Sequence, residues 1–216
     1  MNRPTFKLDM SLMFAMHDAL RRELATITKI GEKPASDAKR ILKAASGWDL
    51  FKTILHIHHV SEDEALWPAL AEAVADRPDD LALVRAMEAE HAAIDPLLEA
   101  IDAALEGDAA SESQSLGTLT KELERTVTKH LEHEERDCLP LIDARISDAA
   151  WLKYGEVHGM RIGPNAPRVL PWLLDGAPEP VVTMVLGRLP EPARNAYSAA
   201  WEPAYAATDR WGLTAS

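Results

Sequence analysis

Four stretches of the chain repeat apolar residues at steps of three and four, which is the spacing of one helix face. Glycine or proline stands at several of their ends, as at Gly31, Pro78 and Gly107. No stretch alternates with period two for long enough to predict a sheet. The pattern predicts an all-α fold, an up-down-up-down four-helix bundle. Its helices are expected at about Met10–Gly31, Trp48–Pro68 or slightly beyond, Leu81–Gly107 and Leu116–Leu141.

Residues 147–216 have a different composition, with most of the 14 prolines and four of the six tryptophans. So many tryptophans are costly to expose, which argues against a disordered tail. We therefore predict a bundle over residues 8–146 and a Pro/Trp-rich helical extension over residues 147–216 that packs on it. Short helices are expected in this extension at Asp148–His158, Pro167–Leu174, Pro180–Arg188 and Pro190–Ala206.

Histidines and acids form an internal repeat along the four predicted helices. The first and third helices carry one histidine each, His17 and His91. On the second and fourth helices a histidine is followed by acids at +4 and +5 and by a proline at +10, in the segments His58–Pro68 and His130–Pro140. The spacings from odd to even helix are similar, 41 residues from 17 to 58 and 39 from 91 to 130. The bundle thus looks like two similar helical hairpins that face each other.

The repeated polar residues fall on the apolar columns of their helices and so point inward. Residues at i and i+4 share a helix face, so each even helix presents a histidine and a glutamate together. A single such pair is usually a surface ion pair, but one polar position on every helix with matched spacing favours a common site. Two buried carboxylates would be costly without cations between them. The candidate metal ligands are His17, His58, Glu62, His91, His130 and Glu134.

Imidazole and carboxylate ligands without thiolate suit iron or manganese, and zinc is allowed. A ferritin-like arrangement would need Glu-x-x-His motifs on two helices of the bundle. Glu88 and His91 have that spacing, but on the third helix, and the fourth helix offers His130 and His133 instead. This order disfavours the ferritin-like alternative.

The segments His58–Pro68 and His130–Pro140, together with His17 and His91, resemble the hemerythrin HHE cation-binding family. The resemblance covers about Leu8 to Asp143. It implies two iron ions joined by an oxo or hydroxo bridge, with manganese or zinc as alternatives. It also implies that His17 and His58 hold one iron, that His91 and His130 hold the other, and that Glu62 and Glu134 bridge them.

One departure from this family bears on function. Oxygen-carrying hemerythrins have a second histidine on the third helix at +4, where this chain has Asp95, followed by Pro96. Asp95 is a possible substitute ligand, and Pro96 should loosen the helix locally. Fewer histidines leave a more open centre, so we expect it to bind or react with hydrogen peroxide, dioxygen or nitric oxide in oxidative or nitrosative stress. A sensing or binding module for iron or oxygen without turnover, or a storage protein, is the alternative, and enzymatic activity stays open.

The remaining polar residues near the repeat have several possible roles. His59 could be an extra ligand or a partner of one. His56 and His133 are expected on the flanks, hydrogen-bonded to acids such as Asp63 or Glu135 that would orient the ligands. His158 has no companion motif, and we treat it as structural. We expect the single cysteine, Cys138, to serve in packing, with redox sensing as a lesser alternative.

Composition excludes several classes of protein. A formal net charge of −12 argues against binding to nucleic acid or to anionic membranes. One cysteine excludes a disulfide within the chain and thiolate zinc sites. No signal peptide or spanning apolar run is visible, so a cytoplasmic location is expected. A small diatomic or peroxide ligand is the expected partner, and the extension offers a surface for a protein partner or a second copy.

Overall fold

The computed structural model describes residues 5–107 and 115–213, and all regular structure within them is helical. The predicted all-α fold is thereby confirmed. Part of the segment from Asp108 to Ser115 that links the third and fourth predicted helices lies outside the described residues. None of the described helices is both long and apolar enough to cross a membrane.

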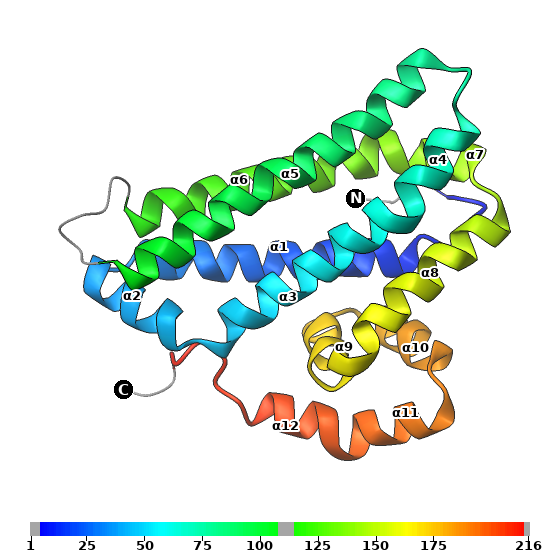
Figure 1. The fold of residues 1–216 in the computed structure, drawn as a ribbon. Helices are drawn as coiled ribbons and strands as arrows, with labels where there is room; N and C mark the ends of the chain where they lie inside the picture. Colours follow the sequence, from blue (N-terminus) through cyan, green and yellow to red (C-terminus); the bar gives the residue numbers. More distant parts are fainter. Residues whose placement is uncertain (1–4, 108–114, 214–216) are drawn as a thin grey trace.

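Four long helical rods form the bundle (Figure 1), as predicted. Two rods are single helices, α1 (Ser11–Gly31) and α5 (Pro78–Glu106). The α6 rod packs against both of them. The connector after α1 contains a helix that the sequence analysis did not predict, α2 (Ala35–Ala44). The other two rods are composite. The second rod consists of α3 (Ser46–Ser61), a π-helical turn (Glu62–Leu66) and α4 (Trp67–Ala73). The fourth rod consists of α6 (Leu116–His133), a π-helical turn (Glu134–Cys138) and α7 (Leu139–Arg145).

The π-helical turns follow from the prolines of the repeat. The first turn closes with a hydrogen bond from the Trp67 amide to the Glu62 carbonyl, and Pro68 comes next. The second closes in the same way from Leu139 to Glu134, immediately before Pro140. A proline ring clashes with the carbonyl four residues earlier and provides no amide to bond it, and a wider turn relieves this conflict. The prolines therefore place a π turn directly at each glutamate of the repeat.

Pro96 does not interrupt its helix. It lies inside α5, which runs without a break from Pro78 to Glu106. Tertiary packing supports this helix on either side of the proline, because Ile94 and Ile101 are fully buried. The local loosening expected at Pro96 thus leaves the third rod continuous as a helix.

The apolar core is split into two parts by a polar layer. Along the sequence of every rod, apolar residues from one part of the core precede the polar residues, and apolar residues from the other part follow the polar residues. On α5, for example, Met87 belongs to one part, Ile94 to the other, and His91 lies between them. On α1, Met13 and Leu20 flank the polar layer similarly. The layer of histidines and glutamates therefore crosses the middle of the bundle.

The extension packs on the bundle and shares its core. Its first helix, α8 (Asp148–Ile162), lies against α3 and the first π turn, and α9 (Ala166–Leu174) contacts α1 and α3. Trp172 and Trp211 are buried in the same apolar part of the core as the bundle residues. The rest consists of a 3₁₀ turn (Gly163–Asn165), α10 (Glu179–Arg188), α11 (Glu191–Ala196), a third π turn (Tyr197–Trp201) and α12 (Glu202–Ala206).

Two glycines bring α1 and α6 into close contact at the end of the bundle near α2. A Cβ atom placed on Gly117 would lie 2.9 Å from the carbonyl oxygen of Gly31. A Cβ atom placed on Gly31 would lie 3.1 Å from the Cβ of Thr120, a fully buried residue. Only glycine fits at this approach of the two backbones.

Candidate metal centre

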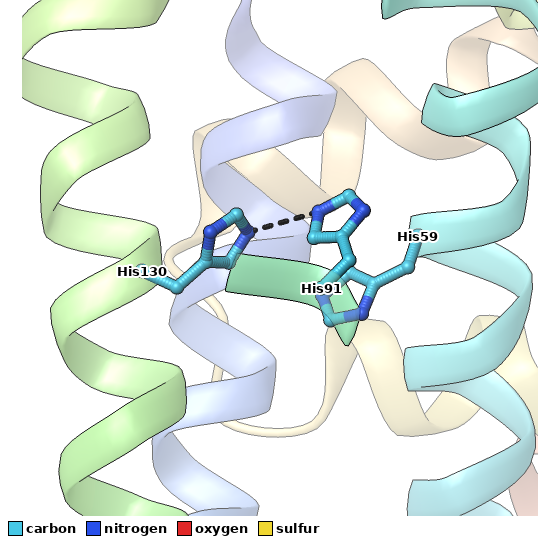
Figure 2. Close-up of side chains that lie close together, drawn as sticks. All are labelled: His59, His91 and His130. Carbon is cyan, nitrogen blue, oxygen red and sulfur yellow. Dashed lines mark hydrogen bonds between the residues drawn. The ribbon is translucent and has the colours of Figure 1, made fainter. Parts of the chain in front are cut away.

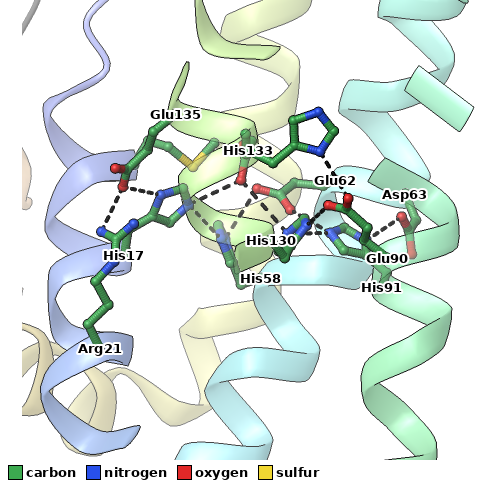
Figure 3. Close-up of polar contacts among 12 residues, drawn as sticks. His17, Arg21, His58, Glu62, Asp63, Glu90, His91, His130, His133 and Glu135 are labelled. Carbon is green, nitrogen blue, oxygen red and sulfur yellow. Dashed lines mark hydrogen bonds and ion pairs between the residues drawn. The ribbon is translucent and has the colours of Figure 1, made fainter. Parts of the chain in front are cut away.

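Six buried side chains from all four rods meet in the polar layer (Figure 3). None of them is more than 5% exposed. Three lie on helices α1, α5 and α6, one near the end of α3, and the two glutamates begin the two π turns. The structure thus brings together all six side chains that the sequence singles out as ligands: His17, His58, Glu62, His91, His130 and Glu134.

The histidines form two pairs, one in each hairpin. The Nε2 atoms of His17 and His58 are 3.2 Å apart, and those of His91 and His130 are 3.1 Å apart. Two nitrogens bound to one ion at about 2.1 Å would be separated by roughly 3.0 to 3.4 Å, between octahedral and tetrahedral angles. Each pair therefore has the spacing of two imidazoles that share a metal ion.

The two glutamates reach both pairs. Glu62 lies 3.4 Å from Nδ1 of His58 through Oε1 and 3.5 Å from Nε2 of His91 through Oε2. Glu134 Oε2 is 3.3 Å from Nε2 of His17 and 4.0 Å from Nε2 of His130. Glu134 thus stands between the Nε2 atoms of one imidazole from each hairpin, where a bridging ligand would be needed. Glu62 faces Nε2 of His91 but Nδ1, not Nε2, of His58.

Several of these carboxylate oxygens lack a hydrogen-bond partner. Within the described part of the chain, no well-aligned hydrogen bond reaches Glu62 Oε2 or either oxygen of Glu134, although both side chains are fully buried; the two Oε2 atoms have only the imidazole contacts of 3.3 Å or longer given above. Burial and the neighbouring Glu134 raise the pKa of Glu62 well above its usual value. Burial lowers the pKa of His17, but Glu134 and Glu135 outweigh this effect and raise it. Unpaired buried oxygens are costly, and cations between the imidazoles would satisfy them. The donor set fits a pair of metal ions.

Three of the four paired histidines are held from behind by a carboxylate. Nδ1 of His17 lies 2.8 Å from Glu135, and Nδ1 of His91 lies 2.8 Å from Asp63. In both cases the acid five residues after the repeat histidine of the second or fourth rod bonds the histidine of the first or third rod, which belongs to the other hairpin. Nδ1–H then donates to the carboxylate, which directs the Nε2 lone pair into the centre.

The third of these histidines is His130, whose Nδ1 lies 3.1 Å from Glu90, the residue before His91 on α5. The fourth histidine, His58, differs from the other three. The corresponding residue before His17 is Met16, and Nδ1 of His58 has no hydrogen-bond partner among the residues described. The two hairpins are therefore not equivalent in how they support their histidines.

Glu90 was missed by the sequence analysis because it lies outside the repeat. It also binds Nδ1 of His133, 2.9 Å away, so His133 pairs with this acid rather than with Asp63 or Glu135 as predicted. The predicted acids are present but serve His91 and His17. Arg21, one turn after His17, was also missed; it donates to the same Glu135 oxygen at 2.8 Å. Together with His17, it lowers the pKa of Glu135 to about 2 in spite of the opposing effect of burial.

His59 joins the second pair of histidines (Figure 2). It is buried, its ring stacks on that of His91 with the centroids 3.9 Å apart, and its Nε2 atom has no partner within the described part of the chain. Ligand atoms of His59, His91 and His130 lie within 4.8 Å of one another, as do those of the other group, His17, His58, Glu62 and Glu134. Asp95 is exposed and belongs to neither group, and His56 is exposed as well.

The extension contributes two residues that were not predicted to lie near the site. The Tyr154 hydroxyl donates a hydrogen bond of 3.4 Å to Oε1 of Glu62. The ring of His158, which we expected to be only structural, lies 6.1 Å from that of His58 between centroids. Both come from α8, which has no counterpart in the repeat. Cys138 is fully buried, and burial raises the pKa of its thiol, which fits the expected packing role.

Comparison with known proteins gives one match. A family model described as the hemerythrin HHE cation-binding domain matches residues 9–142. No curated protein and no solved structure matches the chain significantly. The matched range contains all six clustered histidines and glutamates and the carboxylates behind them, and it ends before α8.

Proposed function

This chain belongs to the hemerythrin HHE cation-binding family, and on that premise we propose that it is a non-haem di-iron protein that binds and reacts with small oxidants. The oxidants are hydrogen peroxide, dioxygen or nitric oxide, and the role is defence against oxidative or nitrosative stress. In this proposal His17 and His58 hold one iron, His91 and His130 hold the other, and Glu62 and Glu134 bridge the two.

The unpartnered carboxylate oxygens between the two imidazole pairs carry this proposal. A fold that served only as a scaffold would gain nothing from burying Glu62 and Glu134 in the middle of its core. Imidazole and carboxylate ligands suit iron, and the carboxylates behind three of the imidazoles raise their basicity as ligands. Manganese and zinc also bind imidazole and carboxylate ligands, so elemental analysis of the purified protein is needed to identify the metal.

The reactivity is inferred from the number of ligands. Two or three imidazoles and two shared carboxylates leave coordination positions open for a small exogenous ligand. Bound iron would supply Lewis acidity and electrons there. The protein contributes a site that lies between two apolar parts of the core, and the Tyr154 hydroxyl holds one oxygen of Glu62.

Metal analysis together with peroxide consumption tests the proposal. We expect about two irons per chain, a near-ultraviolet absorption band of a bridged pair, and loss of peroxide that is abolished by His58→Ala and Glu62→Ala. His56→Ala is the matched control, because His56 is on the same helix but exposed. Iron well below one per chain after growth in iron-rich medium, or peroxide loss unchanged in both site variants, would contradict the proposal.

A sensing role is the second candidate, and the bond between Tyr154 and Glu62 favours it. Through this bond, metal binding at a bridging carboxylate is coupled to the first helix of the extension. A sensor would show protection of α8 from hydrogen exchange that differs between the metal-free and the iron-loaded protein. Equal protection of α8 in both forms would remove this alternative.

A further inference from the structure

The N-terminal part of α1 and the helix α8 enclose a cavity of about 330 Å³ that ends at the metal centre. His58 forms its inner end, and α8 lies beside α3 along this side of the bundle (Figure 1). Its walls are mainly apolar, with Leu12, Met13 and Met16 on one side and Trp151 and Leu152 on the other.

The cavity is much larger than a diatomic molecule or hydrogen peroxide requires. Such molecules occupy a space similar to that of one water, roughly 30 Å³ in the liquid. Sites for organic ligands start at about 300 Å³ and are mostly apolar with a few polar groups. The volume and lining of this cavity thus fit an organic molecule better than an inorganic oxidant.

Two polar side chains of α8 face the apolar walls. His158 is 6% exposed, and its Nε2 atom has no hydrogen-bond partner among the described residues. The Tyr154 hydroxyl donates to Glu62 and keeps its own acceptor sites. A ligand hydroxyl can both donate and accept, so it satisfies the His158 nitrogen in either tautomer.

The mouth of the cavity carries no unbalanced charge. Arg188 on α10 lies at the mouth, but its guanidinium is paired with Asp9. Leu152, which is 65% exposed, presents an apolar side chain to the entering molecule. These features favour a neutral ligand over a carboxylate or a phosphate.

We propose that this cavity binds a neutral organic molecule with an apolar body and one hydroperoxyl or hydroxyl group, which points to His158 and Tyr154 beside His58. The inference rests on the proposed function and narrows its substrate to organic hydroperoxides. Reduction of such a molecule to its alcohol and water takes up two electrons and two protons. Two ferrous ions held by the six ligands of the proposed centre would supply these electrons, one each, and solvent would supply the protons.

Binding is tested with 2-phenyl-2-propanol, the redox-inert alcohol of cumene hydroperoxide, by calorimetric titration of the full chain. Gly155 is on the cavity wall, and a Cβ atom added there meets no atom within 4 Å. Leucine at this position would add a bulky side chain to the cavity wall, starting from a Cβ atom that has room. Gly159, one turn later on the same helix, has the same open surroundings but does not line the cavity, so it is the matched control.

We expect Gly155→Leu to weaken alcohol binding by about tenfold or more, and Gly159→Leu to change it less than about twofold. Thermal unfolding of both variants verifies that they are folded. The inference is overturned if the wild type does not bind the alcohol, or if the two variants bind it equally well.

His158→Phe gives a second, independent measurement, because it keeps a planar aromatic ring of only slightly larger size and removes both ring nitrogens. It should weaken binding of the alcohol more than binding of isopropylbenzene, which lacks the hydroxyl group. Equal effects on both molecules would contradict the assigned position of the hydroxyl.

Activity measurements separate the two proposals. In the iron-loaded protein the ratio of cumene hydroperoxide loss to hydrogen peroxide loss should fall about tenfold in Gly155→Leu. If the wild type consumes neither peroxide but binds the alcohol at this cavity, the proposed function fails and the binding site stands. If the ratio is unaffected by Gly155→Leu, the organic substrate is rejected while the proposed function stands.

Discussion

The first hairpin of the bundle, which carries His17 and His58, and the second, which carries His91 and His130, hold their histidine pairs with nearly the same spacing but support them differently. In the second hairpin Glu90 stands behind His130 and His59 stacks on His91. In the first hairpin Met16 replaces the acid and a cavity adjoins His58. The carboxylate is thus missing on the side of the bundle where the structure leaves space.

This difference teaches that a repeated motif can fix the geometry of a site while its two halves take on separate tasks. A histidine fixed by a carboxylate is a stronger and more rigid ligand. We therefore expect the second half-site to hold its metal more tightly and the first to be the one that a ligand reaches.

The largest effect is expected from the two glutamates, since each reaches both hairpins. Glu62→Ala and Glu134→Ala should each reduce bound iron to less than about a tenth of the wild-type amount at both half-sites. Iron is measured on the protein after gel filtration. Glu64→Ala is the control, because Glu64 is an exposed acid two residues after Glu62. Loss of only one of two irons in either variant would show that each carboxylate serves a single half-site.

Glu90→Met makes the second hairpin resemble the first. Without its carboxylate partner, His130 should bind metal more weakly, and the affinity of the second half-site should fall roughly 10- to 100-fold. Competition with a chelator measures this, and two phases of metal release in the wild type should merge towards one. Glu88→Met, an exposed position on the same helix, is the control. Two unchanged phases in Glu90→Met would mean that the hairpins differ for another reason.

His59→Leu removes the other difference, since leucine stands at the corresponding position of α6, Leu131. If His59 supports the second half-site, the affinity there should fall about tenfold and that of the first should stay the same. The chelator titration again measures both. His56→Leu on the exposed face of α3 provides the comparison. An equal decrease at both half-sites would assign His59 to the bundle as a whole.

The smallest effect is expected for Tyr154→Phe, which removes the bond to Glu62 on the side of the first hairpin and a weak contact of the same hydroxyl with the Met13 sulfur. The free energy of unfolding should fall by about 1 kcal/mol, the usual net value of one buried hydrogen bond. Urea denaturation of the metal-free protein measures it. Tyr205→Phe removes a hydroxyl that bonds Asp175 at an exposed site, and it should cost less. A Tyr154 variant as stable as the wild type would show that the bond at 3.4 Å contributes nothing.

Sequence periodicity was sufficient to predict the four rods and to place the six clustered side chains on their inner faces. A histidine such as His91 on a strict apolar column can only point into the bundle, and the repeat identified His17 as the equivalent histidine of the other hairpin. The acids at +5 were expected to support ligands, but their partners could not be assigned. Asp63 and His91 meet across two hairpins, which depends on how the helices pack rather than on spacing within either one.

Other contacts left no signal in the sequence. Glu90, Tyr154 and His158 act through single long-range approaches, without periodicity or repetition to mark them. Each is an ordinary residue for its own helix. The prolines at +10 were visible, but their effect, a widened turn that starts at each glutamate, depends on the backbone finding a lower-energy path past the ring.

The glycine contact between α1 and α6 has a mechanical consequence for the centre. Gly31 is 14 residues after His17, and Gly117 is 13 residues before His130, so in each rod the contact lies about 20 Å from the histidine. Each of the two helices would pivot about this contact, so a change there would displace the residues of the centre. A methyl group added at Gly31 would tilt the two helices and change the distance between His17 and His130, both of which Glu134 contacts. The geometry of the centre would thus depend on two residues without side chains at the end of the bundle near α2.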